Sequence, residues 1–271
     1  MNRRPIGVFD SGIGGLTVVR ELLQQLPHES LIYFGDTARV PYGNKSPATV
    51  RRYAREILDF LVARNVKMVV VACNTASAHA LDELRRVAPV PVVGVIDPGA
   101  RAAVAASRSG RIGVIGTAGT IASGAYERAI HAHAGAVAVV AQACPLFVPL
   151  VEEGWLDHPA TRLIAESYLG ALSGHEIDAL VLGCTHYPLL KPLLGEILGP
   201  GIALIDSAEQ TARAVAEELA HSTLHAPRTA EAHVHFVVSD APDQFRKVGK
   251  RFLGDRVRDI ERVTFGEGDA R

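Results

Sequence analysis

Short runs of apolar residues alternate along the chain with segments that carry apolar residues at helical spacing. The runs have the length of buried parallel strands, which are apolar on both faces. They lie at residues 6–9, 31–34, 68–71, 92–96, 112–115, 137–140 and 179–182. Between them, residues 49–64, preceded by Pro47, and residues 159–172 are typical of crossover helices. The pattern predicts the α/β class, with mainly parallel sheets flanked by helices.

The first part of the chain resembles a later part at nearly constant spacing. Three pairs of segments match in the same order, at offsets of 106, 111 and 109 residues: 6–11 with 112–117, 70–75 with 181–186, and 95–97 with 204–206. Apolar strands resemble one another by chance, so the shared offset carries the argument and no single match does. We predict two pseudo-symmetric lobes built from one α/β unit.

The matched residues Asp97 and Asp206 mark where we expect the chain to cross between the lobes. The first predicted lobe is discontinuous and combines residues 1–97 with residues 207–271. The second comprises residues 98–206. We expect the active site in a cleft between them, because open α/β sheets bind ligands beyond the carboxyl ends of their strands.

Polar residues and cysteines follow four of the predicted strands at that end. The segments are Asp10-Ser11, Cys73-Asn74-Thr75, Gly116-Thr117 and Cys184-Thr185-His186. Cys73 and Cys184 occupy matched positions in the repeat, so two facing lobes would bring them to opposite sides of one cleft. Cys144 has no counterpart and is interpreted as a structural residue.

Two facing thiols suit the inversion of a carbon stereocentre by proton transfer. The intermediate is planar, so a base must act on one face and an acid on the other, and a thiolate and a thiol can fill these roles. A helix that begins after each cysteine would lower the thiol pKa and offer N–H groups to a carboxylate. The alternative is that both cysteines are small core hydrophobes.

Composition and charge exclude several other classes. The 271 residues carry a formal net charge of −1, which provides no general field for a nucleic acid or an anionic membrane. The amino terminus is too short for a signal peptide and no apolar run reaches the length of a transmembrane helix, so we expect a cytoplasmic protein with reduced thiols. No Cys-x-x-Cys pair is present, and we expect no metal site.

Four stretches of the chain resemble a known family, the cofactor-independent glutamate racemases. They are residues 9–18 (FDSGIGGLTV), 41–43 (PYG), 72–77 (ACNTAS) and 183–190 (GCTHYPLL). The similarity extends from Ile6 to about Gly254 and includes residues 149–155 (PLVEEGW) and 252–254 (FLG). It implies interconversion of L- and D-glutamate without a cofactor, to supply D-glutamate for peptidoglycan, and a homodimer as the usual assembly.

The resemblance also implies roles for individual residues. Cys73 would act on D-glutamate and Cys184 on L-glutamate, with electrostatic support from Asp10, Glu152 and His186. The alternative for Asp10 is a helix N-cap, and Glu152 taken alone would be interpreted as part of a solvated helix surface. The implied substrate contacts are Asp10, Ser11, Pro41, Tyr42, Gly43, Asn74, Thr75, Thr117, Thr185 and His186. The repeat independently pairs Thr117 with Ser11.

Four other functions compete with this interpretation. Residues 12–15 (GIGG) follow a strand, but the dinucleotide fingerprint would need glycine where Thr17 stands. A two-lobed amino-acid-binding protein would not explain paired cysteines. A pyridoxal phosphate racemase needs a Schiff-base lysine, and none of the five lysines lies at a strand-end motif. Aspartate racemase uses the same two-thiol chemistry, and only a comparison of the two substrates would separate it.

Overall fold

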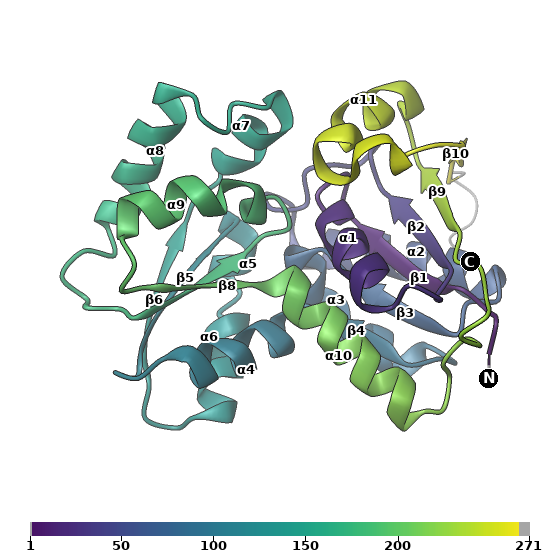
Figure 1. Ribbon diagram of the computed structural model, residues 1–271, viewed down its shortest axis with the longest axis horizontal. Helices are drawn as coiled ribbons and strands as arrows, with labels where there is room; N and C mark the ends of the chain where they lie inside the picture. The colour runs from purple at the N-terminus through teal and green to yellow at the C-terminus, as the bar shows by residue number, and fades with distance from the viewer. Residues whose placement is uncertain (1, 266–271) are drawn as a thin grey trace.

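Two parallel sheets organise the protein, whose computed structural model describes residues 2–265 (Figure 1). Sheet A has the strand order β10-β9-β2-β1-β3-β4 and sheet B the order β6-β5-β7-β8. Every pairing is parallel. The strands are β1 Ile6–Asp10, β2 Leu31–Gly35, β3 Met68–Val71, β4 Val92–Gly94, β5 Arg111–Gly116, β6 Ala138–Ala143, β7 Ala179–Gly183, β8 Ala203–Asp206, β9 Val234–Val238 and β10 Ile260–Arg262.

Helices cover both sheets and form two lobes. Lobe A consists of sheet A with α1, α2, α3 and α11, and lobe B consists of sheet B with α5 to α9. Helices α4 and α10 follow the edge strands β4 and β8, respectively, and pack against each other. The helices are α1 Leu16–Gln25, α2 Pro47–Ala63, α3 Asn74–Val87, α4 Ile96–Ala106, α5 Ala118–Ala122, α6 Ala125–His133, α7 Phe147–Glu153, α8 Pro159–Gly170, α9 Lys191–Leu198, α10 Ser207–His221 and α11 Pro242–Leu253, with 3₁₀ turns η1 Tyr187–Leu190 and η2 Gly254–Arg256.

The predicted α/β class with two lobes is confirmed, and so is the repeat. Within sheet A the order β2-β1-β3-β4 corresponds strand for strand to β6-β5-β7-β8 of sheet B. The third sequence match, of residues 95–97 with 204–206, was wrong in register. Val71 and Leu182 are matched positions in the repeat, and Val71 pairs with Gly94 whereas Leu182 pairs with Asp206. The counterpart of Asp206 is therefore Gly94, three residues before Asp97. The lobe division at residues 97/98 and 206/207 stays a prediction.

One strand boundary also differs from the prediction. The apolar run at 92–96 ends its strand at Gly94, and α4 begins at Ile96. Asp97 and Pro98 favour this early start, since a first helical turn tolerates proline and gains from a nearby carboxylate. The predicted helix at 49–64 begins earlier, at Pro47, because the Ser46 hydroxyl accepts a hydrogen bond from the Thr49 N–H as N-cap.

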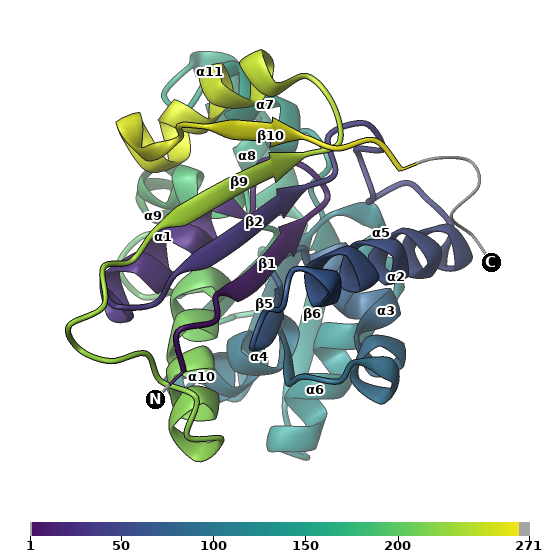
Figure 2. The same ribbon diagram turned by 90° about the vertical axis from the view of Figure 1, so that its right-hand side faces the viewer.

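The carboxyl-terminal segment completes sheet A. Strand β9 pairs with β2, and β10 continues the sheet beyond it, as Figure 2 shows. Two layers of helices enclose the sheet: α1 packs on α10 and α11, and α2 packs on α3. Within residues 2–265 no helix is long and apolar enough to cross a membrane.

Candidate active site

The loops at the carboxyl ends of β1, β3, β5 and β7 meet between the lobes. The Thr17 hydroxyl of α1 donates to the Thr185 carbonyl at 3.0 Å, and the Thr185 hydroxyl lies 3.5 Å from Asp10 Oδ1. A second contact joins the Thr75 and Thr117 hydroxyls at 2.9 Å. The four strand-end segments that the sequence singled out therefore form one site, with residues from both lobes.

Cys73 occupies the N-cap position of α3 and is 5% exposed. Its Sγ accepts a hydrogen bond from the Ala76 N–H at 3.4 Å, as the predicted helix start requires. The expected lowering of its pKa does not occur. Burial and then the charge of Asp10 raise the pKa of Cys73 to about 12, and the hydrogen bonds from Ala76 and Ser11 oppose this only in part.

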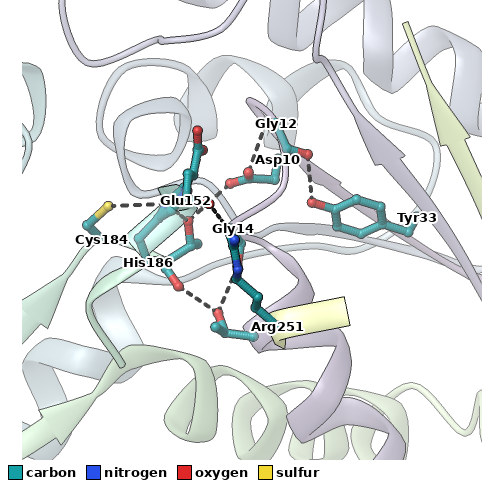
Figure 3. Close-up of polar contacts among 10 residues, drawn as sticks. Asp10, Gly12, Gly14, Tyr33, Glu152, Cys184, His186 and Arg251 are labelled. Atoms are coloured by element: carbon teal, nitrogen blue, oxygen red, sulfur yellow. Dashed lines mark hydrogen bonds and ion pairs between the residues drawn. The ribbon is translucent and has the colours of Figure 1, made fainter. Parts of the chain in front are cut away.

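Cys184 has a different partner. It follows β7, is 5% exposed, and its Sγ lies 3.9 Å from Nδ1 of His186. The other ring nitrogen of His186, Nε2, lies 2.8 Å from Oε1 of Glu152. Contacts therefore run from Cys184 through His186 to Glu152 (Figure 3). The residues after Cys184 form a 3₁₀ turn rather than the expected α-helix.

The electrostatics of this line favour a charged His186. Burial disfavours the imidazolium, but the hydrogen bonds and negative charges of Cys184 and Glu152 outweigh burial and raise the pKa of His186 to about 10. An imidazolium beside a sulfur can hold a thiolate as an ion pair. The two thiols thus face opposite neighbours, a carboxylate near Cys73 and an imidazolium beside Cys184.

Asp10 is fully buried at the end of β1. Its Oδ2 accepts from the Gly12 N–H at 3.0 Å, and α1 begins only at Leu16, so Asp10 is not the N-cap of that helix. Burial raises its pKa, while the charge of His186 and nearby backbone N–H groups oppose the rise. A buried carboxylate between the lobes is suited to hold a cationic group.

The other residues expected to contact a ligand lie either where the two lobes meet or in the loop at 41–43. Asn74, Thr75, Thr185 and His186 are buried at the meeting point of the lobes, and Ser11 and Thr117 are partly buried beside them. The loop at 41–43 behaves differently. Pro41 is exposed, and the Tyr42 hydroxyl donates to Asp36 within lobe A, so this loop offers a ligand its backbone and not the phenol of Tyr42.

Gly14 lets the lobes approach each other closely. A Cβ at this position would lie 2.2 Å from Thr185 Oγ1 and 2.4 Å from His186 Nδ1. Gly43 is also close to the other lobe, since its carbonyl accepts from the Gly119 N–H at 2.8 Å. The glycine-rich loop therefore serves the contact between lobes, which agrees with the rejection of a dinucleotide fingerprint.

Sequence reasoning missed several residues around the site. Thr120 joins the hydroxyl cluster of Thr75 and Thr117, and Tyr126 donates to Asn74 at 2.7 Å. Arg251 of α11 donates to the Glu152 carbonyl, and Phe252 packs edge-on against His186. Only the FLG stretch hinted at α11; nothing in the local pattern around Thr120 or Tyr126 distinguishes them.

A cavity of about 180 Å³ lies beside Glu152 between the lobes. Its walls include Gly12 and Ile13 of the glycine-rich loop, Val40, and Phe245 of α11. Among residues 2–265 no group of three or more His, Cys, Asp and Glu side chains is arranged to hold a metal ion. The side chains that the site itself presents are thiols, an imidazole, carboxylates and hydroxyls.

Comparisons with known proteins identify relatives of this chain in sequence and in fold. The family model described as Asp/Glu/Hydantoin racemase matches residues 6–215. A glutamate racemase of Geobacter metallireducens is 56% identical, over 96% of this chain and 97% of that enzyme. The crystal structure of glutamate racemase isoform RacE1 from Bacillus anthracis has a TM-score of 0.93 at 39% identity, covering 98% and 99% of the two chains. Glutamate racemase from Francisella tularensis, solved in complex with D-glutamate, has a TM-score of 0.91 at 40% identity, covering 97% and 98%.

Proposed function

Since the chain belongs to the Asp/Glu/hydantoin racemase family, we propose that it interconverts L- and D-glutamate by moving a proton at Cα between two cysteines. One observation carries the proposal. Cys73 and Cys184 follow corresponding strands of the two lobes, each is 5% exposed, and Cys184 contributes to the raised pKa of Cys73. The relative that binds D-glutamate supports the choice of substrate.

In the direction from L-glutamate, the Cys184 thiolate removes the α-proton. The C–H electron pair stays on the substrate, which becomes planar, and an S–H bond forms on Cys184. The Cys73 thiol then gives its proton to the opposite face, so that a new C–H bond forms and Cys73 becomes a thiolate. Starting from D-glutamate, the same steps run in reverse, and exchange with solvent restores either starting state.

The neighbours of the two sulfurs fit this sequence. Burial and Asp10 raise the pKa of Cys73 to about 12, which suits a thiol that gives its proton, and His186, whose pKa is raised to about 10, lies next to Cys184. Asp10 would hold the substrate ammonium, while N–H and hydroxyl donors of Ser11, Thr75, Thr117 and Thr185 would hold the carboxylates and support the charge that develops on the intermediate.

The site supplies these groups from its own residues, and we propose that it needs neither metal nor organic cofactor. From the resemblance we also propose that the product serves peptidoglycan synthesis in the cytoplasm and that the enzyme is a homodimer. No partner beyond a small substrate is proposed, neither a nucleic acid nor a membrane.

Circular dichroism of glutamate tests the activity directly. We expect the purified protein to racemise L- and D-glutamate without additives, and L- and D-aspartate much more slowly. Activity should survive a metal chelator and hydroxylamine, which captures carbonyl cofactors, and should be lost on thiol alkylation. Loss of activity with the chelator and its recovery on addition of metal would contradict the cofactor-free proposal. Faster turnover of aspartate than of glutamate would contradict the assignment of glutamate as the substrate.

Replacing Glu152 with glutamine should lower the pKa of His186. The mutation removes one of the anions that favour the imidazolium, and because Glu152 is about one-third exposed we expect the lower end of such effects, about one unit. The His186 pKa is raised in the folded state, so the pair stabilises the fold below the unfolded value of 6.5 and this contribution fades as pH rises towards about 10. Thermal unfolding should separate wild type from Glu152→Gln most clearly near pH 6. An equal difference at pH 6 and above pH 10 would contradict the ion pair.

A further inference from the structure

The side chain of Asn74 has an unused hydrogen-bond donor. Asn74 begins α3 directly after Cys73 and is 2% exposed. Its Oδ1 accepts a hydrogen bond from the Tyr126 hydroxyl at 2.7 Å, while its Nδ2 has no partner among residues 2–265. A buried N–H group without a partner is costly and therefore rare in folded proteins. Next to a thiol proposed to be catalytic, such a donor is available to an anionic ligand.

Tyr126 comes from the other lobe and is tightly held. It lies in α6, is 3% exposed, and its ring fits against two glycines. A Cβ at Gly183 would lie 2.9 Å from the ring, and one at Gly99 would lie 3.3 Å from it. Burial raises the pKa of the Tyr126 phenol, so the hydroxyl stays protonated and can donate. The ring has little room to move away from Asn74.

We propose that Tyr126 is a positioning residue, which holds the Asn74 carboxamide with its Nδ2 donor free for a carboxylate of the bound amino acid. A carboxamide has an oxygen that accepts hydrogen bonds and an NH₂ group that donates them. A hydroxyl that donates to the oxygen therefore fixes the orientation in which the NH₂ group points to the ligand. Without the hydroxyl, Asn74 can turn and present its oxygen to the carboxylate, which repels it. This inference rests on the proposed function, because the ligand is taken to be an amino dicarboxylate.

The hydrogen bond also crosses between lobes, since Asn74 belongs to lobe A and Tyr126 to lobe B. Asn74 is therefore oriented only while the lobes are together. A carboxylate that enters between separated lobes would meet a freely turning amide, and closure would fix the donor towards it.

The test is Tyr126→Phe, which keeps the ring in its slot and removes the hydroxyl. We expect kcat/KM to fall by about tenfold to a hundredfold, mainly through KM, because a carboxylate is bound alike in the ground state and the transition state. The fall must be equal from L- and D-glutamate, since the enantiomers have equal free energies and share one transition state.

Tyr168→Phe is the matched control. Its hydroxyl, also in lobe B, accepts a hydrogen bond from the Leu146 N–H at 3.3 Å, and its ring packs on Phe147. We expect this variant to keep kcat/KM within about twofold of wild type. A Tyr126→Phe enzyme that matched it would overturn the proposal.

A double-mutant cycle separates positioning from a general structural effect. If Tyr126 acts through Asn74, then Tyr126→Phe should change kcat/KM by less than about twofold in an Asn74→Ala background. If the two losses multiply instead, Tyr126 acts on the site by another route and the proposal is wrong.

A spectroscopic measurement tests the positioning without turnover. The chain has four asparagines, Asn2, Asn44, Asn65 and Asn74, so ¹⁵N-asparagine labelling gives few side-chain amide signals, and Asn74→Ala assigns the relevant pair. Tyr126→Phe should shift or broaden the Asn74 pair, whereas Tyr168→Phe should not. An unchanged pair would overturn the inference. A wild-type protein that held this amide but did not racemise glutamate would instead refute only the proposed function.

Discussion

Replacement of either Cys73 or Cys184 with alanine is expected to lower glutamate racemisation by at least about 10⁴-fold in both directions. Each variant leaves one face of the substrate without a group that can move a proton, and the third thiol, Cys144, follows β6 rather than β3 or β7. The measurement is circular dichroism of glutamate with each purified variant, after far-ultraviolet spectra have shown that it is folded.

Cys144→Ala is the control for thiol loss. Cys144 is buried like the other two, but its Sγ makes only a 3.7 Å contact with the Gln142 carbonyl, and its own carbonyl, which accepts from the Tyr187 hydroxyl, is retained in alanine. We expect near-normal turnover. A folded Cys73→Ala enzyme that retained comparable racemisation would refute the pairing of the cysteines.

Heavy water shows whether the two thiols act on opposite faces. Wild-type enzyme given L-glutamate should place solvent deuterium in D-glutamate as soon as it forms, while the remaining L-glutamate stays nearly unlabelled. Starting from D-glutamate should give the mirror result. A single base that moved between faces could return the original proton, so marked protium retention in newly formed product would count against opposed cysteines.

The parts of the fold that the sequence predicted are those with strong local patterns. Strands β1, β3, β5 and β7 are buried along nearly their whole length and read as uninterrupted apolar runs, which also placed Cys73 and Cys184 at their ends. Strands β9 and β10 gave a weaker signal. His235 and Glu261 interrupt their apolar positions, and β10 lies at the edge of sheet A, where one side meets solvent.

What could not be predicted depends on contacts between distant residues. Lys67, immediately before β3, is fully buried and pairs with Glu29, and it donates to the carbonyls of Asn2 and Leu224. A lysine next to a strand gives no local sign of such partners. The raised pKa of Cys73 has the same origin, since a helix start is visible in the sequence but the burial that outweighs it comes from a core cluster of residues distant in sequence, such as Phe9 and Phe34.

The second large effect is expected from one added methyl group. Gly14→Ala should lower kcat/KM by about a hundredfold or more, because its Cβ would overlap Thr185 Oγ1 and His186 Nδ1, at 2.2 and 2.4 Å. Both neighbours are buried, and the Gly14 carbonyl is held by the N–H and hydroxyl of Thr17, so neither side can yield without moving His186 away from Cys184. Displacements near 1 Å in a catalytic arrangement cost rates of this order.

Gly12→Ala provides the matched comparison within the same loop. Its Cβ would approach only Val40, at 3.3 Å, and Val40 is 42% exposed, so the valine can shift into solvent. Neither glycine has the left-handed backbone that would itself disfavour alanine. We therefore expect Gly12→Ala to keep kcat/KM within about threefold of wild type and Gly14→Ala to lose it while remaining folded by circular dichroism. Equal activity in the two variants would mean that the lobes do not meet at Gly14 during catalysis, and the close approach of His186 to the glycine-rich loop would have to be abandoned as a feature of the working enzyme.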